Sequence, residues 1–236
     1  MPPTARRFAV STGPRSLSVA DVTGLSARAR ATAHAYDAVA DQYADLVRDE
    51  LEGLPLDRAI LTAFADLVRD GEPGPVAELG CGPGRITHHL HRMGVEIFGI
   101  DLSPALIGIA RASFPGLRFD VGSMDALDLP GDCLAGVVSW YSIIHIPPDD
   151  MPAYLTEFRR VLRAGAPLLL GFFEAAGEPV TAFDHKVITA YRWPIDTLAR
   201  TAGEAGFTEI GRMLREPGDG ERFRRGHLLM RAADRT

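Results

Sequence analysis

The sequence has 236 residues, of which 46% are apolar, enough to bury one substantial hydrophobic core and too few to suggest a second full domain. Acidic residues outnumber basic ones by 31 to 25, which gives a formal net charge of -6. Proteins that bind DNA or RNA through their phosphates carry an excess of positive charge. We therefore expect no nucleic-acid partner.

Cysteine usage and hydropathy indicate the cellular compartment in which the protein is expected. The two cysteines, Cys81 and Cys133, lack the C-x-x-C spacing of a zinc site or a redox pair, which fits a reducing cytoplasm. No apolar run approaches the roughly 20 residues of a membrane-spanning helix, and the first residues contain no apolar core of a signal peptide. These features predict a soluble protein of the cytoplasm with no membrane partner.

The first 30 residues differ in composition from the rest. They are rich in Arg, Ser, Thr, Ala and Pro, contain one acidic residue, Asp21, and show no periodicity, which predicts a flexible N-terminal arm over 1–30. An organelle transit peptide has a similar composition and is a less favoured alternative. We expect residues 31–236 to form a single domain.

This domain opens with a predicted helical cap over 31–72. From Ala33, apolar and aromatic residues recur at steps of three and four, the period of one helix face, so the pattern predicts an amphipathic helix. These residues are Tyr36, Val39, Ala40, Tyr43, Leu46 and Val47. A second helical pattern runs from Leu56 to Val68 and ends at the GEPGP sequence of 71–75, which breaks helices.

Beyond Pro75, short apolar runs alternate with helical patterns, as is typical of parallel strands in an α/β fold. Five such runs are present: Val76–Leu79, Val95–Ile100, Leu117–Val121, Leu134–Trp140 and Leu168–Phe173. Helices are expected to begin near Arg85, Ser103 and Pro152, with Ser103 as an N-cap.

The last part of the chain begins with a segment, 174–195, that lacks clear periodicity and is expected to be an insertion on the substrate side. A helix is predicted over Ile195–Ala205, ending at Gly206. Two strand-like runs follow, Phe207–Leu214 and His227–Ala232, and we expect them to pair as an antiparallel hairpin.

The most informative stretch is VAELGCGPGR, in which a strand leads directly into glycines at positions 80, 82 and 84 and then into a helix. Glycines in such a turn admit positive φ and allow a ligand to lie against the main chain at the carboxyl edge of the sheet. Asp101 ends the next strand, where a carboxylate can accept hydrogen bonds from both hydroxyls of a ribose. The pattern predicts a nucleoside site.

The spacing of the glycines indicates which nucleoside binds. Dinucleotide sites use G-x-G-x-x-G, whereas this turn is G-x-G-x-G and follows Glu78. A carboxylate beside the turn would repel a pyrophosphate and suits a ligand that carries an ammonium and a sulfonium. Alternatively, Glu78 only caps or packs at the end of the strand.

The motif ELGCGPGR followed by GIDLS resembles the first two motifs of class I S-adenosylmethionine-dependent methyltransferases, and the resemblance extends from about Tyr36 to Ala232. It implies that the glycine turn holds the methionine part of S-adenosyl-L-methionine as cofactor. Asp101 would bind the ribose, and Leu102 would flank the adenine.

Further motifs extend the resemblance. The sequence GSMD at 122–125 would place Ser123 and Met124 against adenine, and a fourth motif follows at 138–145. The YDxVAxxY pattern from Tyr36 to Tyr43 resembles a helix that many small-molecule members fold over the cofactor; the alternative is a core-facing aromatic stripe. The implied cofactor-binding residues are Tyr36, Tyr43, Glu78, Gly80, Gly82, Gly84, Arg85, Asp101, Leu102, Ser103, Ser123, Met124, Ser139, Trp140 and Tyr141.

The resemblance also implies the fold. It is a Rossmann-like, doubly wound α/β sheet of seven strands in the order 3-2-1-4-5-7-6, with strand 7 antiparallel, plus the N-terminal helical cap. The C-terminal hairpin would supply strands 6 and 7.

Methyl transfer from a sulfonium is an in-line displacement, so orientation of the reactants and exclusion of water are the main contributions of the protein. An acceptor hydroxyl or acidic carbon must also lose a proton, and histidine is well suited to take it near neutral pH. His145 and His185, which follow the fourth strand and precede the last helix, are the candidate catalytic residues. The alternative for His145 is a structural hydrogen bond.

The sequence thus predicts a methyltransferase acting on O, N or C of a small-molecule metabolite. Its fourth motif reads Ser139-Trp140-Tyr141 where amino methyltransferases of nucleic acids and amides carry Asp or Asn before Pro-Pro-aromatic. Asp149 and Asp150 are interpreted as the start of a helix, so no metal is expected. Two alternatives are other chemistry that uses the positive charge of the cofactor, and a non-catalytic nucleoside-binding module. The sequence leaves the acceptor and the oligomeric state open.

Overall fold

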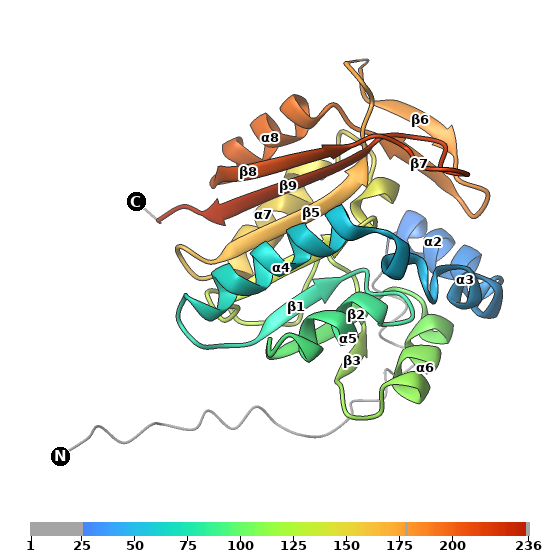
Figure 1. The fold of residues 1–236 in the computed structure, drawn as a ribbon, viewed down its shortest axis with the longest axis horizontal. Helices are drawn as coiled ribbons and strands as arrows, with labels where there is room; N and C mark the ends of the chain where they lie inside the picture. The colour runs from blue at the N-terminus through green and yellow to red at the C-terminus, as the bar shows by residue number, and fades with distance from the viewer. Residues whose placement is uncertain (1–25, 178, 235–236) are drawn as a thin grey trace.

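The structure is a computed structural model that describes residues 26–177 and 179–234, so most of the expected arm over 1–30 lies outside the described residues. Seven strands form one sheet in the order β3-β2-β1-β4-β5-β9-β8 (Figure 1). They are β1 (Val76–Leu79), β2 (Ile97–Asp101), β3 (Phe119–Val121), β4 (Gly136–Trp140), β5 (Pro167–Phe173), β8 (Phe207–Arg215) and β9 (Arg225–Ala232).

The predicted strand order is confirmed. Strands β1 to β5 are parallel, and β9 is antiparallel to both β5 and β8. Two short strands, β6 (Thr181–Asp184) and β7 (Thr189–Arg192), form a separate hairpin, so β9 and β8 are the seventh and sixth strands of the main sheet. The fold is therefore the expected Rossmann-like arrangement.

Helices cover both faces of the sheet. The α-helices of the described residues are α2 (Ala27–Asp37), α3 (Ala40–Val47), α4 (Pro55–Arg69), α5 (Arg85–Arg92), α6 (Pro104–Ser113), α7 (Met151–Val161) and α8 (Ile195–Glu204). Two short 3-10 helices are η1 (Glu50–Gly53) and η2 (Ile143–His145). As predicted, Ser103 caps α6, with its hydroxyl accepting from the amide of Leu106.

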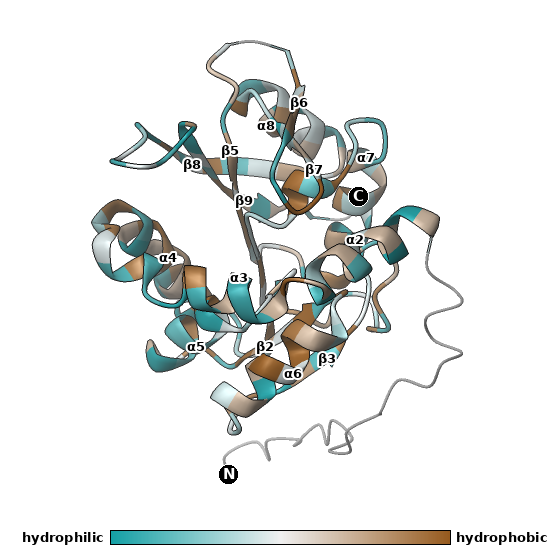
Figure 2. Cartoon of the chain, turned by 90° about the vertical axis from the view of Figure 1, so that its right-hand side faces the viewer, coloured by the Kyte–Doolittle hydropathy of each residue, from teal (hydrophilic) through white to brown (hydrophobic). Residues whose placement is uncertain are grey.

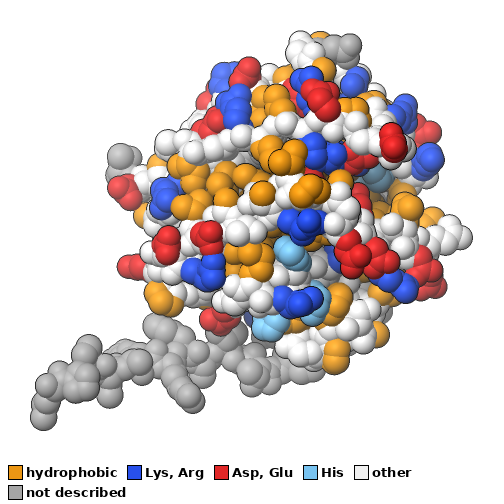
Figure 3. Space-filling view, viewed as in Figure 1, with side chains coloured by type: hydrophobic (Ala, Val, Ile, Leu, Met, Phe, Trp, Pro, Cys, Tyr) orange, Lys and Arg blue, Asp and Glu red, His pale blue; other side chains and the backbone are white. Residues whose placement is uncertain are grey.

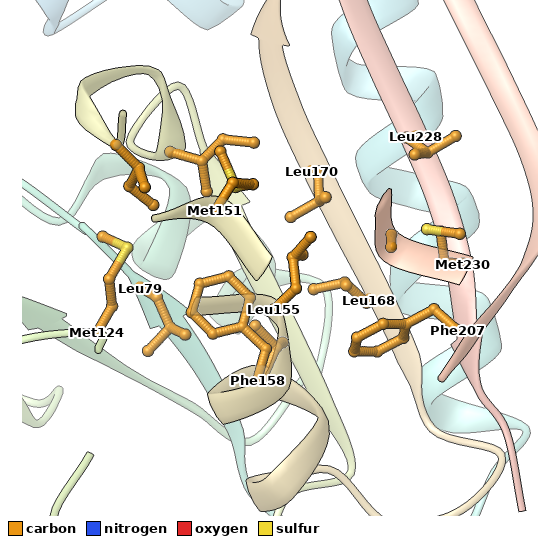
Figure 4. Close-up of a cluster of buried hydrophobic side chains, with 14 of the residues drawn as sticks. Leu79, Met124, Met151, Leu155, Phe158, Leu168, Leu170, Phe207, Leu228 and Met230 are labelled. Atoms are coloured by element: carbon orange, nitrogen blue, oxygen red, sulfur yellow. The ribbon is translucent and has the colours of Figure 1, made fainter. Parts of the chain in front are cut away.

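The hydrophobic core lies in two layers because the central strands are buried on both faces. Every residue of β4 and β5 is buried, as expected for strands inside a parallel sheet. One layer joins α4 and α5 to the sheet. The other joins α7 and α8 to it, and Figure 4 shows Leu155 of α7 beside Leu168 of β5. These layers hold the carboxyl ends of the strands in a fixed register.

The N-terminal cap differs from the sequence expectation in two ways. Helix α2 begins at Ala27, inside the segment expected to be part of the arm, because the Ser26 hydroxyl caps it by accepting from the amide of Ala29 at 3.1 Å. The single helix expected from Ala33 is instead divided at 38–39 into α2 and α3. The Asp37 carboxylate, at the end of α2, accepts from the Ser103 hydroxyl and from the amide of Ala105 in α6. This contact fixes the point where the chain turns.

The segment 174–195 contains the hairpin β6–β7, which the sequence analysis did not predict. Each strand has only four residues, and the half-buried alternation of β6 is too short to stand out as a period. In Figure 1 the hairpin lies at the same end of the sheet as α2 and α3. The insertion is thus placed near the carboxyl edge of the strands.

The surface carries charges of both signs. On the face shown in Figure 3, acidic and basic side chains are interspersed. None of the helices in 26–177 and 179–234 combines the length and the apolar character needed to cross a membrane.

Candidate functional site

A pocket of about 820 Å³, including its open mouth, lies at the carboxyl edge of the sheet. Figure 2 looks toward this edge, with α2 and α3 in front of the strand ends. The walls come from α2, α3, the turn after β1, and the residues that follow β2, β3 and β4.

The glycine turn forms the floor of this pocket. Gly80 and Gly82 line it with φ of 76° and 51°, values that L side chains rarely adopt. A Cβ atom at Gly80 would lie 2.2 Å from Cβ of Ser142. At Gly84 it would lie 2.7 Å from the Phe119 ring, so the third glycine serves helix packing and is not on the pocket wall.

Asp101 faces the pocket with both carboxylate oxygens oriented by the backbone. Its Oδ2 accepts from the amide of Gly82, and its Oδ1 accepts from the amide of Ser103, each at 2.8 Å. Each oxygen keeps a second lone pair that can accept from a ligand hydroxyl. Burial raises the pKa of Asp101, while the two amides act in the opposite direction.

An apolar wall with one buried hydroxyl continues the pocket beside Asp101. Leu102, Leu106, Met124 and Ile146 line it. Ser123 lies between the lining residues Gly122 and Met124 but does not itself line the pocket. It is 6% exposed, and its hydroxyl has no hydrogen-bond partner among the residues the structure describes. A flat, polar-edged ring such as adenine fits a wall of this kind, because it can pack on apolar side chains and use the hydroxyl.

Three of the expected cofactor residues support the turn from behind and do not line the pocket. The Arg85 guanidinium pairs with Glu50 at 2.7 Å. The Ser139 hydroxyl is 2.5 Å from that of Ser142, which is a lining residue and donates to the carbonyl of Leu79 at 2.6 Å.

The third is Glu78, which lies buried under the turn and accepts from the Thr87 hydroxyl. Burial raises the pKa of Glu78 to about 8. A raised pKa means that burial disfavours the charged carboxylate, which weakens the case for Glu78 as a negative charge beside the ligand. Its position agrees with the alternative interpretation, packing at the end of the strand.

His145 forms a wall of the pocket and is held from two sides. Its Nδ1 lies 3.1 Å from the carbonyl oxygen of Thr189, which can only accept, so Nδ1 carries the proton. Its Nε2 is then free to accept from the hydroxyl of Tyr36, 2.8 Å away. Burial lowers the pKa of His145 to about 4, so the ring is neutral at neutral pH. The Tyr36 ring in turn packs edge-on against Tyr43 of α3.

His185 lies behind His145 and does not line the pocket. The two imidazole centroids are 5.2 Å apart in an edge-on arrangement, and the rings of Phe173 and Phe183 surround His185 at 6.0 Å. The structure thus brings the two histidines named from the sequence together, although 40 residues separate them.

Several lining residues were not identified from the sequence. Arg28, Ala29 and Thr32 lie in α2, partly within the segment interpreted as an arm, so no signal pointed to them. Tyr154 lines the pocket from α7, where it resembles any half-buried helical tyrosine. Within the described ranges, no group of three or more His, Cys, Asp or Glu side chains is arranged to hold a metal ion.

The chain was compared with known proteins. Residues 76–165 match a family model described as a methyltransferase domain. A trans-aconitate 2-methyltransferase of Rhizobium meliloti is 31% identical over 106 residues, covering 42% of this chain and 37% of the relative. A ubiquinone biosynthesis O-methyltransferase of Cereibacter sphaeroides is 33% identical over 92 residues, or 37% of this chain and 36% of that relative. The alignments thus span little more than a third of these relatives.

Solved structures have the same fold. The 1,6-didemethyltoxoflavin-N1-methyltransferase of Burkholderia thailandensis, with bound 1,6-didemethyltoxoflavin and S-adenosylhomocysteine, superposes with a TM-score of 0.61. The superposition covers 86% of this chain and 91% of that chain at 22% identity, which is a likeness of fold. With the family match over the glycine turn and the four motifs, the resemblance found in the sequence is confirmed. Residues 76–165 thus match a methyltransferase domain, and the chain has the fold of S-adenosylmethionine-dependent methyltransferases.

Proposed function

We propose that the protein binds S-adenosylmethionine in this pocket and transfers its methyl group to a small-molecule acceptor without a metal ion. The observation that carries the proposal is the joint placement of Gly80, Gly82 and Asp101 in one pocket, with each Asp101 oxygen held by a backbone amide. The buried hydroxyl of Ser123, which has no partner in the described chain, is a polar group for the adenine. When bound, S-adenosylmethionine supplies an electrophilic methyl group on a cationic sulfonium.

The residues of the chain contribute binding and orientation. Asp101 accepts from the ribose hydroxyls, and the turn at Gly80 and Gly82 lets the amino-acid part lie against the main chain. Leu102 and Met124 flank the adenine. Trp140 and Tyr141 close the pocket after β4. Helices α2 and α3 cover the mouth, which keeps water from the reacting atoms.

His145 and Tyr36 are the polar groups that we propose to face the acceptor. With Nδ1 bonded to Thr189, His145 holds the Tyr36 hydroxyl through Nε2. The Tyr36 oxygen keeps a lone pair that can accept a hydrogen bond from the small-molecule substrate. His185 does not reach the pocket, so we propose that it positions the His145 ring. The domain boundaries proposed here are a cap that begins with α2 at Ala27 and extends to 72, instead of the cap over 31–72 expected from the sequence, and a substrate-side insertion over 174–195.

The acceptor is proposed to be a small metabolite. The relatives named above are called methyltransferases of trans-aconitate, of ubiquinone biosynthesis and of 1,6-didemethyltoxoflavin, all small molecules. The interspersed surface charges agree with an acceptor other than nucleic acid. Cys81 and Cys133 are both free thiols, which agrees with a cytoplasmic location.

Calorimetric titration with S-adenosylmethionine and S-adenosylhomocysteine tests the cofactor assignment. The wild type should bind both, and Asp101→Ala should weaken binding at least tenfold, about 1.4 kcal/mol. The matched control is Asp120→Ala, since Asp120 is a half-buried aspartate of β3 that pairs with Arg118 and does not line the pocket. A folded wild type that binds neither compound would refute the proposal. Equal weakening in both variants would show that the effect does not arise from the ribose contact.

A further inference from the structure

Tyr141 is the strained residue of the pocket. Its φ of 54° lies in the left-handed region, which costs a residue with a large side chain about 1 to 3 kcal/mol. Three other described non-glycine residues have positive φ, namely Asp132, Ala176 and Lys186, and none of them lines the pocket. Strain at a pocket wall therefore needs surrounding contacts that keep the tyrosine in place.

The first of these contacts is a histidine on a distant strand. The Tyr141 hydroxyl is 3.0 Å from Nε2 of His227 in β9, and His227 is fully buried. The imidazole of His227 also packs against Trp140, with centroids 4.8 Å apart. One histidine thus contacts both aromatic residues that close the pocket after β4.

A buried carboxylate stands behind this histidine. Oδ1 of Asp57 in α4 lies 3.5 Å from Nε2 of His227, and its Oδ2 accepts from Nε of Arg215 at 2.7 Å. Asp57 is 1% exposed. A carboxylate near Nε2 favours a proton on that nitrogen, which then donates to the Tyr141 oxygen.

A second set of contacts holds the ring itself. The Arg225 guanidinium lies over the Tyr141 ring at 4.9 Å and over the Phe173 ring at 4.5 Å. Glu221 accepts from Arg225 at 3.2 Å and from Arg215 at 2.6 Å, so it joins this guanidinium to the pair of Arg215 and Asp57. The hydroxyl and one face of the Tyr141 ring are therefore both in contact with the network.

Stability alone does not explain this arrangement. A buried ion pair often adds no net stability over an apolar replacement. Here Oδ1 of Asp57 and Nδ1 of His227 are buried without a hydrogen bond in the described chain, which is a cost that a purely structural cluster would avoid. Since the groups converge on a strained pocket residue, their function must be sought at the pocket.

We propose that Asp57 and His227 are positioning residues that act through the Tyr141 hydroxyl to hold the Tyr141 wall of the pocket in its binding geometry. The inference rests on the proposed function, because it assigns these residues to the same cofactor pocket. It adds a role for three segments, at 57, 215–227 and 141, that no motif of the family connects in the sequence.

The test is the affinity for S-adenosylhomocysteine of a small set of variants of the full chain, measured by calorimetry. Tyr141→Phe removes only the hydroxyl, and we expect the dissociation constant to rise about tenfold. His227→Leu should have the same effect, whereas His227→Gln, whose amide nitrogen can still donate, should stay within about twofold of the wild type. The control is Tyr191→Phe, at a half-buried tyrosine of β7 outside the pocket, which should leave the affinity unchanged.

The double variant separates positioning from simple stabilisation. In the Tyr141→Phe background, His227→Leu should weaken binding less than twofold further, because its effect passes through the missing hydroxyl. A full additional loss, or a Tyr141→Phe variant that binds as tightly as the wild type, would overturn the inference. If circular dichroism shows that His227→Leu does not fold, the affinities of Tyr141→Phe and His227→Gln still test the positioning role of His227. A wild type that fails to bind would instead refute the proposed function.

Discussion

The two sides of the pocket are built in different ways. On the side of β1 and β2, the walls are backbone and one carboxylate from two short motifs, the turn at 76–85 and Asp101. On the side of β4, β5 and β9, side chains from positions 57 to 227 must meet around Tyr141. A wall made of backbone depends on local conformation, whereas a wall made of side chains depends on the whole fold.

The electrostatics of the two sides also differ. On the first side, the carboxyls of Glu78 and Asp101 accept hydrogen bonds from a hydroxyl and from backbone amides, which are neutral groups. Burial raises the pKa values of both. On the second side they meet arginine. Hydrogen bonds from Arg215 lower the pKa of Glu221 to about 2. Burial would raise the pKa of Asp57, but His227 and Arg215 outweigh it and lower the value. Changes of pH should therefore act on the two sides in opposite directions.

The largest expected effect comes from breaking the side-chain wall. Arg215→Met leaves Asp57 buried without its cationic partner, so we expect a loss of about 3 to 5 kcal/mol in the free energy of unfolding. Urea denaturation measures it. The control is Arg212→Met, which removes a more exposed arginine between Asp196 and Glu209 and should cost about 1 kcal/mol or less. Similar losses in the two variants would contradict the contrast between the walls.

Breaking the backbone wall should chiefly affect binding. Gly80→Ala combines a φ of 76° with a clash at Ser142, so we expect the affinity for S-adenosylhomocysteine to fall about a hundredfold, or 2.7 kcal/mol. Gly94→Ala is the matched control, since its φ is 86° and no atom lies within 4 Å of the added Cβ. It should cost about 1 kcal/mol of stability with unchanged affinity. Equal affinities of the two variants would rule out a specific role for the close approach at Gly80.

The stability of the fold should depend on pH through Glu78. Glu78 has a raised pKa, so the folded protein binds its proton more tightly, and unfolding should become easier as the pH rises from about 4.5 to about 8. Glu78→Gln keeps the contact with Thr87 and should not lose stability over this pH range. Its free energy of unfolding relative to that of the wild type should therefore be higher at pH 8 than at pH 5, by a difference of the order of 2 kcal/mol. Denaturation curves at the two pH values measure it.

Glu221→Gln should have the opposite profile. The lowered pKa of Glu221 stabilises the fold above about pH 4.5 and is lost as the pH falls toward 2, so the variant should be less stable than the wild type at pH 7 and approach it in acid. The same sign for both variants would contradict the assignment of the shifts.

The smallest effect is expected where the two sides meet at the cap. His145→Asn can still donate to Thr189 but no longer accepts from Tyr36, so α2 should loosen. We expect S-adenosylhomocysteine to dissociate about three to five times faster, or roughly 1 kcal/mol, with faster amide hydrogen exchange over 27–37. Tyr36→Phe should reproduce both changes. Unaltered hydrogen exchange in α2 would show that the contact between His145 and Tyr36 does not hold the cap on the pocket.

In the wild type the same contact should respond to acid. The lowered pKa of His145 means that the unfolded chain binds its proton more readily, so this contribution to stability is complete above about pH 6.5 and lost as the pH falls toward 4. Exchange in α2 should therefore accelerate over that range in the wild type and not in His145→Asn.

Much of the first side could be predicted because its signals are local. The glycine spacing, Asp101 at a strand end and the Ser103 cap each depend on residues close in sequence, and the structure places them as expected. The N-terminal cap was predicted only in part, since the division of the helix at 38–39 depends on the contact of Asp37 with α6.

The sequence by itself determined the positions of the main-sheet strands, the glycine turn and the acid that follows it, because hydrophobic periodicity and turn chemistry act over a few residues. The order of the strands in the sheet was implied by the family resemblance, and the structure confirms it. Tertiary structure alone decided that Glu78 is buried with a raised pKa, that His145 has a lowered pKa and is bonded to Tyr36, and that Tyr141 contacts His227, which lies beside Asp57. These properties arise from desolvation and from contacts between segments far apart in the chain, which no local pattern records.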